Sequence, residues 1–337
     1  MKKTLLAVAL TTVSTAALAD VSLSGHVSAQ ITDRDSSDDT VFQQLGFSQS
    51  RFRIKADKEI KGLTFGINQE YGTGNEQSSI NVRQHSLFVK GAFGTIRLGD
   101  HNDVGDGYMN TGVNGTWRSN PIAVNSFTHG TNGASNGFDP GRGQALRYYS
   151  PKIGGVATFG IQFENDGRAA AALNVGTHGF AFKAFAEDSG DAETDASGIM
   201  VGYRAPFGLG ITYVAASKDR AASSTTTAAP GATFSVDPAT GVIVPSATVT
   251  TTVGEGTDEF EGIQVGYSMG KIRASISKTE RDNTDNGGAA DTVDTVGAGF
   301  EYDYGKGVTF WVSYLDLEGN DVVADDTAVS LGALFTF

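Results

Sequence analysis

The sequence contains no cysteine, only 7 prolines and, after its N-terminal segment, no long apolar run. Without thiols the chain can form no disulfide scaffold, zinc–thiolate site, iron–sulfur cluster or cysteine nucleophile. No later apolar run approaches the ~18 residues that a transmembrane helix needs. Positive charge is also scarce, because 25 Lys and Arg face 38 Asp and Glu, for a net charge of −13. An acidic surface repels phosphate backbones, which excludes nucleic acid as the main partner.

Residues 1–19 have the order of a secretory signal peptide. Lys2 and Lys3 precede an apolar run, and the segment ends in the small-residue motif Ala17-Leu18-Ala19. We therefore expect cleavage after Ala19 and a single mature domain over residues 20–337. Export of this kind leaves two classes open, a soluble protein outside the cytoplasm and a membrane β-barrel.

Apolar and polar residues alternate with a period of two through most of the remaining chain, which is typical of half-buried strands. In residues 21–31 the odd positions are apolar or small and the even positions between them are polar. Counting the weaker candidates, we predict sixteen strands between residue 20 and the C-terminus. An even number of strands is typical of an outer-membrane barrel.

The predicted connections alternate in length. Short turns such as 91–94 alternate with long polar stretches at 32–45, 187–197, 279–292 and 316–325. Short connections on one side and long ones on the other are again typical of an outer-membrane barrel. Within the low-complexity stretch 221–257, an Asp-Pro turn at 237–241 separates two short β-prone runs and predicts a small extracellular hairpin.

The polar faces of these strands carry Arg, Lys, Glu and Gln. In a soluble β-sandwich the two apolar faces meet in a core, and these long polar side chains would cover the outside. In a barrel that faces lipid the arrangement is inverted, and sixteen strands enclose a lumen too wide for side chains to fill. We therefore predict an all-β, 16-stranded antiparallel transmembrane β-barrel with a water-filled interior, and a soluble all-β fold stays the alternative.

Two segments resemble those of the general trimeric porins of proteobacteria. They are residues 83–99, RQHSLFVKGAFGTIRLG, and residues 142–155, RGQALRYYSPKIGG. The resemblance implies a homotrimeric barrel in the bacterial outer membrane, with a long third loop, residues 100–139, folded into the pore. Phe88 departs from the family pattern, which usually has glycine there. The final Phe337 resembles the signal that the outer-membrane barrel assembly machinery reads.

Basic side chains gather on the polar faces of the strands near these segments. They are Arg51, Arg53, Lys55, Arg97, Arg142 and Arg147. The third loop carries Asp103 and Asp106. A basic wall opposite an acidic loop would set up a transverse field that orients dipolar solutes at a pore constriction. In the alternative interpretation these arginines pair with Asp57, Glu70 or other neighbours and line a passive wall.

We find no catalytic pattern in the sequence. The five histidines fall on separate segments, and neither a Gly-x-Ser-x-Gly elbow nor a phosphate-binding glycine loop occurs. We therefore expect no enzyme activity and no cofactor, although the acidic connections could bind Ca²⁺ or Mg²⁺ weakly.

The expected function is that of an outer-membrane porin, a water-filled channel for passive diffusion of ions and small hydrophilic solutes. A solute-specific channel of the sugar type, and a barrel that acts mainly as an adhesin or phage receptor, remain open. The expected partners are two further copies in a homotrimer, outer-membrane lipid and lipopolysaccharide, and the barrel assembly machinery, which would bind through Phe337.

Overall fold

The structure is a computed structural model, and it is almost entirely antiparallel β-sheet. It describes residues 20–35, 37–43, 50–73, 80–105, 142–165, 167–190, 195–220, 223–228, 234–236, 243–245, 248–253, 256–285, 291–319 and 325–337. The predicted signal peptide, residues 1–19, lies outside the described residues. No helix among the described residues is long and apolar enough to cross a membrane.

Seventeen strand segments form one sheet. They are β1 (Asp20–Arg34), β2 (Ser37–Gln43), β3 (Arg51–Ile60), β4 (Leu63–Thr73), β5 (Ile80–Gly91), β6 (Gly94–Asn102), β7 (Arg142–Tyr149), β8 (Ala157–Glu164), β9 (Ala169–Thr177), β10 (Phe180–Asp188), β11 (Ala196–Arg204), β12 (Leu209–Arg220), β17 (Gly256–Met269), β18 (Ile272–Asp285), β19 (Asp291–Gly305), β20 (Val308–Glu318) and β21 (Asp326–Thr336). Because β2 and β3 pair with successive parts of β1, they count as one strand around the sheet. The seventeen segments therefore make sixteen strand positions. The predicted strand number is confirmed.

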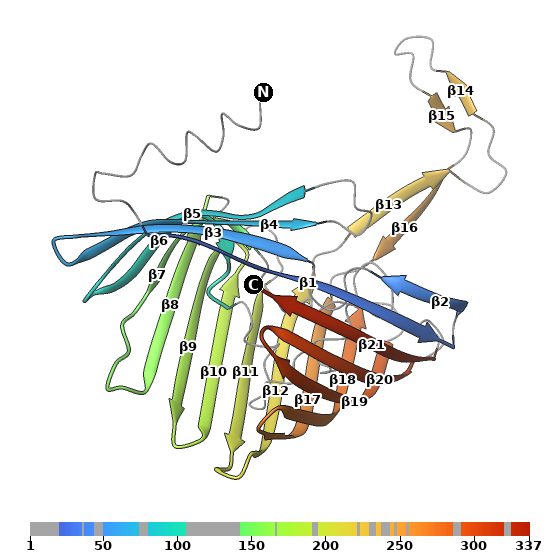
Figure 1. The fold of residues 1–337 in the computed structure, drawn as a ribbon. Helices are drawn as coiled ribbons and strands as arrows, with labels where there is room; N and C mark the ends of the chain where they lie inside the picture. The colour runs from blue at the N-terminus through green and yellow to red at the C-terminus, as the bar shows by residue number, and fades with distance from the viewer. Residues whose placement is uncertain are drawn as a thin grey trace, which may run out of the picture.

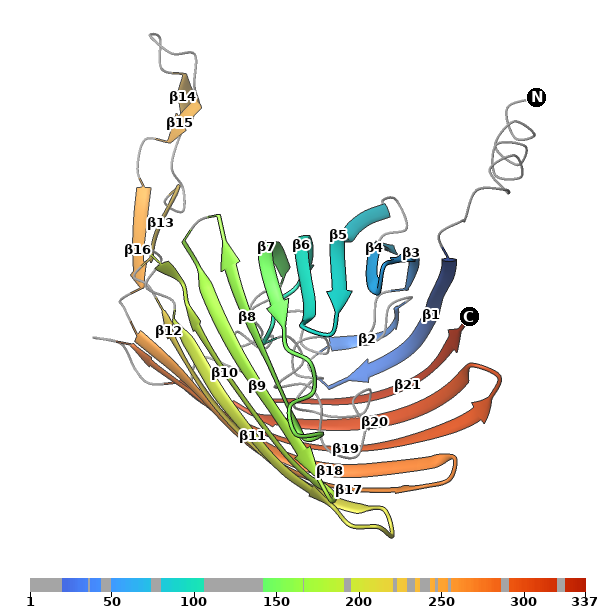
Figure 2. The same ribbon diagram turned by 90° about the vertical axis from the view of Figure 1, so that its left-hand side faces the viewer.

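The sheet closes on itself into a barrel, because β1 pairs with β3 on one side and with β21 on the other (Figure 1). The backbones of Gly25 and Phe337 exchange two hydrogen bonds of 2.9 and 3.0 Å at this seam. On the inner side, the hydroxyls of Thr32 and Ser330 lie 3.0 Å apart across the same seam. Both views place β3–β6 across the barrel from β17–β20 (Figures 1 and 2).

Two-residue turns form several of the connections at one end of the barrel. Lys61-Gly62, His178-Gly179 and Lys306-Gly307 have positive φ at both residues, with Lys61 at 52° and Gly62 at 78°. This conformation matches the twist of a tight hairpin, and glycine adopts it without steric cost. The glycines after Lys61, His178 and Lys306 therefore fix the register of three hairpins.

The connections at the other end are shorter than the sequence predicts. The stretches 32–45, 279–292 and 316–325 are expected to be long and polar, yet β1 runs to Arg34 and β2 occupies residues 37–43. Likewise β18 runs to Asp285 and β19 begins at Asp291. Cross-strand backbone hydrogen bonds do not depend on apolar side chains, so strands continue past the lipid-facing band with polar residues on both faces. Polarity marks the end of that band and not the end of the strand.

The predicted hairpin in the low-complexity stretch is confirmed. Strands β14 (Phe234–Val236) and β15 (Ile243–Pro245) pair antiparallel, and β13 (Ser223–Ala228) pairs with β16 (Thr248–Val253) below them. Together they form an arm between β12 and β17 that stands away from the barrel (Figure 1). The β13–β16 pair is not predicted from the sequence, because its threonine-rich strands lack a clear alternation.

The two faces of the barrel wall differ as the alternation predicts. Large apolar side chains are exposed on the outer face, among them Val21 at 69%, Ile276 at 63% and Leu331 at 60%. The inner face holds buried polar side chains, such as Thr32 and Gln264, which are fully covered. An apolar outside with a polar inside fits lipid around the barrel and water within it.

Aromatic rings on the inner face lie over glycines of the neighbouring strand. Trp311, which is 2% exposed, pairs directly with Gly332, and Phe185 pairs with Gly198 in the same way. A Cβ added at Gly332 would overlap the indole, and one at Gly198 would lie 2.7 Å from the ring of Phe185. These glycines make room for rings that lie flat against the wall, which leaves the lumen open.

Replacing Gly332 by Ala is expected to destabilise the barrel by about 1–3 kcal/mol, the usual cost of overpacking a filled site. The thermal unfolding midpoint of the folded protein in detergent measures this. Adding Trp311→Ala should relieve the overlap, so the double variant should be less destabilised than the sum of the single variants. Strictly additive losses of stability would contradict the packing of the Trp311 indole against Gly332.

Candidate functional site: the wall of the lumen

The residues predicted to line a pore constriction lie mostly on the inner face of β3, β6 and β7. On β3, Arg51 and Arg53 both bind the carboxylate of Glu70 on β4, with Arg51 Nη1 at 3.0 Å from Glu70 Oε1. Lys55 binds Asp57 of the same strand, with Nζ at 3.0 Å from Oδ1. The pairings with Glu70 and Asp57 that the sequence left as an alternative are thus present.

A third arginine reaches the same carboxylate. Arg83 on β5 places Nε at 3.0 Å from Glu70 Oε1. The register between β4 and β5 shifts after Glu70, which pairs with Gln84, because Tyr71 then pairs with Val82. Arg83 is the extra residue of this β-bulge, and the bulge turns its side chain inward. Three guanidinium groups share one fully buried carboxylate.

Arginines on the facing wall, β17–β19, also form ion pairs. Arg273 on β18 lies 3.1 Å from Glu301 on β19, and Arg281 lies 3.0 Å from Asp258 on β17. Each of these two ion pairs joins one carboxylate to one guanidinium group. The β3–β6 side of the lumen therefore carries more positive charge per carboxylate than the β17–β19 side.

Arg97 on β6 also faces the lumen, and its Nη1 donates to the hydroxyl of Ser86 at 3.1 Å. Neutral amides continue the polar surface beside it. Asn68 donates to Gln84 at 2.6 Å, and Gln84 donates to Asn102 at 2.8 Å. This hydrogen-bonded row holds the inner surface of β4, β5 and β6 in one arrangement.

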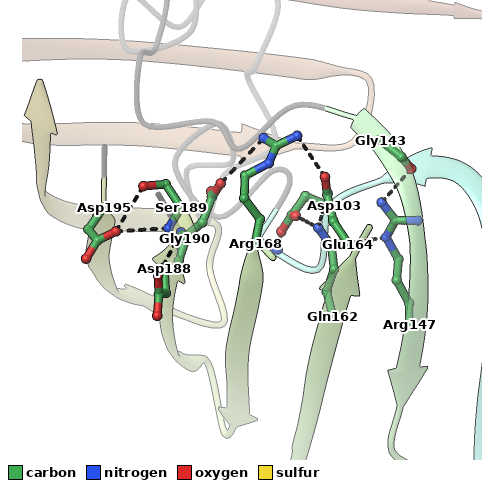
Figure 3. Close-up of polar contacts among 12 residues, drawn as sticks. Asp103, Gly143, Arg147, Gln162, Glu164, Arg168, Asp188, Ser189, Gly190 and Asp195 are labelled. Atoms are coloured by element: carbon green, nitrogen blue, oxygen red, sulfur yellow. Dashed lines mark hydrogen bonds and ion pairs between the residues drawn. The ribbon is translucent and has the colours of Figure 1, made fainter. Parts of the chain in front are cut away.

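Arg147 on β7 is fully buried and does not line an open lumen. Its Nε donates to Gln162 Oε1 at 2.6 Å, Nη1 to the carbonyl of Gly99 at 2.9 Å, and Nη2 to the carbonyl of Gly143 at 3.0 Å. The guanidinium group thus links β6, β7 and β8 (Figure 3). Its position favours a structural role over direct contact with permeating solutes.

Asp103, the first predicted acid of the third loop, lies against the inner side of β8. It is 5% exposed, accepts a hydrogen bond from the amide of Gln162, and caps the N–H of Gly105 at 2.8 Å. Gln162 also donates to Glu164 at 2.7 Å, and Arg168 lies 2.7 Å from Glu164 (Figure 3). The start of the third connection is therefore held to the wall by a charged and hydrogen-bonded cluster.

Val104 adds an apolar contact to the same anchor. It belongs to a buried cluster on the inner face of β9–β12 and β17, and it packs against Gly160 of β8. The other members are Ala170, Ala172, Phe185, Ala196, Met200, Val214, Ala216 and Phe260, with Tyr149 beside them. The simple alternation predicts polar residues on the inner face, and this apolar region departs from it.

Two predicted site residues fall outside what the structure describes. Asp106 and most of the third connection, residues 106–141, lie outside the described residues, and so does the side chain of Arg142. Among the described side chains, no three His, Asp or Glu residues gather in a way that could hold a metal ion.

Sequence reasoning missed Arg83 and Phe88 as part of this wall. The alternation predicts Arg83 on the outer face from its neighbours, and only the bulge reverses it. Phe88 is apolar at an inward position, so a search for charged residues passes over it. Its departure from the glycine of the family pattern was the one available signal.

Comparisons with known proteins agree with this fold. The sequence profile of Gram-negative porins matches residues 5–333. Among solved structures, a loop-deletion mutant of the Vibrio cholerae outer membrane protein OmpT superposes with a TM-score of 0.66 at 13% identity, covering 95% of this chain and 100% of that one. An anion-selective porin from Comamonas acidovorans gives 0.64 at 13% identity, with 95% and 100% covered. Salmonella typhi OmpF in complex with daunomycin gives 0.61 at 16%, with 94% and 97% covered. No curated protein sequence matches the chain.

Proposed function

The chain belongs to the Gram-negative porin family, and on this basis we propose how the charges of its lumen act on the ions and solutes that pass through it. It is an outer-membrane porin that forms a diffusion channel, and it is not an enzyme. The observation that carries the proposal is the closed 16-position barrel with an uneven distribution of charge on its inner face. Solutes that cross such a lumen stay in water and meet the charged wall.

The basic wall of β3–β6 attracts anions and orients dipolar solutes. Arg53 and Lys55 are 44% and 45% exposed toward the lumen, so their charges act on the water that fills it. Acidic residues on the long connections act in the opposite sense at the mouth, within a Debye length of ~8–10 Å at moderate salt. We place Asp106 with Arg51 and Arg53 at the constriction, as the family resemblance implies.

The third connection narrows the lumen. Its first residues support this proposal, because Asp103 and Val104 are buried against the inner wall of β8 and the apolar cluster. These first residues leave β6 toward the inside of the barrel, as a connection that folds into the lumen has to do. The buried apolar cluster gives such a segment a surface to pack on.

Membership of the family supports a proposal for assembly and export. Porin relatives include an OmpT of Vibrio cholerae described in a trimer form, and we propose a homotrimer for this chain. We also propose that residues 1–19 are removed on export, that Phe337 is read by the barrel assembly machinery, and that lipopolysaccharide surrounds the outer face. Diffusion needs no cofactor in this scheme, and Ca²⁺ or Mg²⁺ would bind only weakly to the acidic connections.

A sugar-specific channel is the less favoured function. It requires aromatic faces that a sugar can slide along, and Trp311 is 2% exposed because it lies flat on Gly332. An adhesin or phage receptor would need no conducting lumen. Conductance therefore separates the diffusion channel from the adhesin.

The test is to insert the purified mature protein into a planar lipid bilayer and record conductance in KCl. We expect stepwise openings, grouped in threes if the trimer is correct, and ohmic current at low voltage. A folded barrel that never conducts would contradict the channel and favour the adhesin. Detergent without protein serves as the blank.

Replacing Arg53 by Gln is expected to shift the reversal potential in a KCl gradient toward cation selectivity, because it removes an exposed positive charge from the lumen. Glu70 still binds Arg51 and Arg83 in this variant, so the wall should stay folded. Lys152→Gln, on the exposed connection between β7 and β8, removes the same charge outside the lumen and serves as the control. Equal shifts in the two variants would contradict the assignment of Arg53 to the conducting path.

A further inference from the structure

Phe88 is an aromatic residue in the middle of the basic wall. It lies on β5, is 7% exposed, and pairs directly with Gly66 on β4. A Cβ at Gly66 would overlap the Phe88 ring, so the ring lies over the glycine and against the wall. Phe88 also stands directly opposite Arg97 on β6. The ring thus spans the inner surface between β4 and β6.

Two cations lie over this ring. Lys55 Nζ is 5.6 Å from the ring centroid, and the guanidinium carbon of Arg97 is 5.4 Å from it. They come from β3 and β6, the strands on either side of the β4–β5 pair. Cations within ~6 Å of an aromatic face are attracted by its quadrupole. The ring therefore holds two like charges that would otherwise repel each other.

The partners of these cations show what the ring prevents. Lys55 also binds Asp57, and Arg97 donates to the neutral Ser86. Lys55 Nζ already lies 3.0 Å from Asp57 Oδ1, so without the aromatic face the flexible side chain would keep this ion pair but lose the contact that fixes it on the lumen wall. Arg97 would lose one of the contacts that fix its guanidinium group. Both changes reduce the positive potential that solutes meet in the lumen.

We propose that Phe88 is a selectivity-determining residue of the channel, which positions Lys55 and Arg97 on the lumen wall through cation–π contacts. The proposal rests on the diffusion channel proposed above. It gives a function to the one position in residues 83–99 where an aromatic residue replaces the glycine of the family pattern. Trp311 and Phe185 also lie on glycines, and Phe88 combines this position with two cation–π contacts.

The experiment compares Phe88→Leu with Phe88→Tyr in planar bilayers. Leucine keeps an apolar side chain over Gly66 but removes the aromatic face, and tyrosine keeps the face. From the reversal potential in a KCl gradient, the anion-to-cation permeability ratio of Phe88→Leu should fall by at most about two- to fivefold, the factor by which losing one cation–π contact lowers the population of the positioned cation. Phe88→Tyr should keep the wild-type ratio. Trp311→Leu, a change of the same kind on the β20–β21 wall, should leave the ratio unchanged.

A second variant keeps Phe88 and removes one of the cations. Lys55→Gln should lower the permeability ratio about as much as Phe88→Leu, and the double variant should add little to either single change. An unchanged ratio in Lys55→Gln would overturn the proposal even if Phe88→Leu failed to fold. A lower melting temperature of Phe88→Leu with a wild-type ratio would also overturn it, because the ring would then only cover Gly66. A wild-type protein that does not conduct would overturn the channel itself together with this proposal.

Discussion

Replacing Glu70 by Gln is expected to destabilise the barrel by about 3 kcal/mol, the lower end of the cost of breaking a buried ion pair. Glutamine has the same shape but no charge, so Arg51, Arg53 and Arg83 would lose the carboxylate that holds them together. The lower end applies because Arg53 is 44% exposed and water screens part of its charge. The same change should shift the channel toward anions, since the lumen wall gains one net positive charge.

The measurements are the thermal unfolding midpoint in detergent and the reversal potential in a KCl gradient. Glu301→Gln is the matched control, because Glu301 is equally buried at 1% exposed and forms its ion pair with Arg273. It should be less destabilising, since it leaves one guanidinium group without its partner where Glu70→Gln leaves three. Equal losses of stability in the two variants would contradict the role of Glu70 as a shared centre.

The strand pattern was readable from sequence because lipid and water impose opposite demands on alternate residues. Residues such as Leu23 and Phe310 must be apolar on the outside, and their neighbours must be polar inside. The same reasoning placed Arg51, Arg53, Lys55 and Arg97 on the inner face, where the structure has them. The pairing partners of these residues were less accessible, because cross-strand register depends on turns and bulges. The bulge that turns Arg83 inward leaves no mark in the alternation.

The inner face was also less uniform than a polar lumen suggests. Met200 and Val214 point inward and are 2% and 1% exposed. Apolar residues on both faces of β11 and β12 give a continuous apolar run, and period alone cannot assign either face of such a run to the lumen. The position of Asp103 against β8 could not be predicted from the alternation either, because it depends on how a long connection leaves β6. Such tertiary contacts join residues far apart in sequence, here Asp103 and Gln162.

Replacing Arg147 by Met is expected to loosen the start of the third connection and to destabilise the barrel by about 3 kcal/mol, since a buried polar group left without its partner costs about 1–3 kcal/mol. The side chain is fully buried, and methionine would fill part of its volume without any hydrogen-bond donor. The carbonyls of Gly99 and Gly143 and the side-chain oxygen of Gln162 would each lose the donor that Arg147 supplies. Buried acceptors left without a donor carry their full desolvation cost.

The consequence for the channel follows from Gln162. Its amide binds both Asp103 and Glu164, and Arg147 fixes its orientation from the other side (Figure 3). If Gln162 turns, Asp103 loses its anchor and the third connection leaves the wall more easily. Single-channel records of Arg147→Met should therefore show more frequent closures and larger current noise than wild type. Arg147→Lys keeps the charge but lacks the planar fork of donors, so it should restore stability only in part. Quiet wild-type currents in a destabilised Arg147→Met would show that the cluster supports the barrel without controlling the third connection.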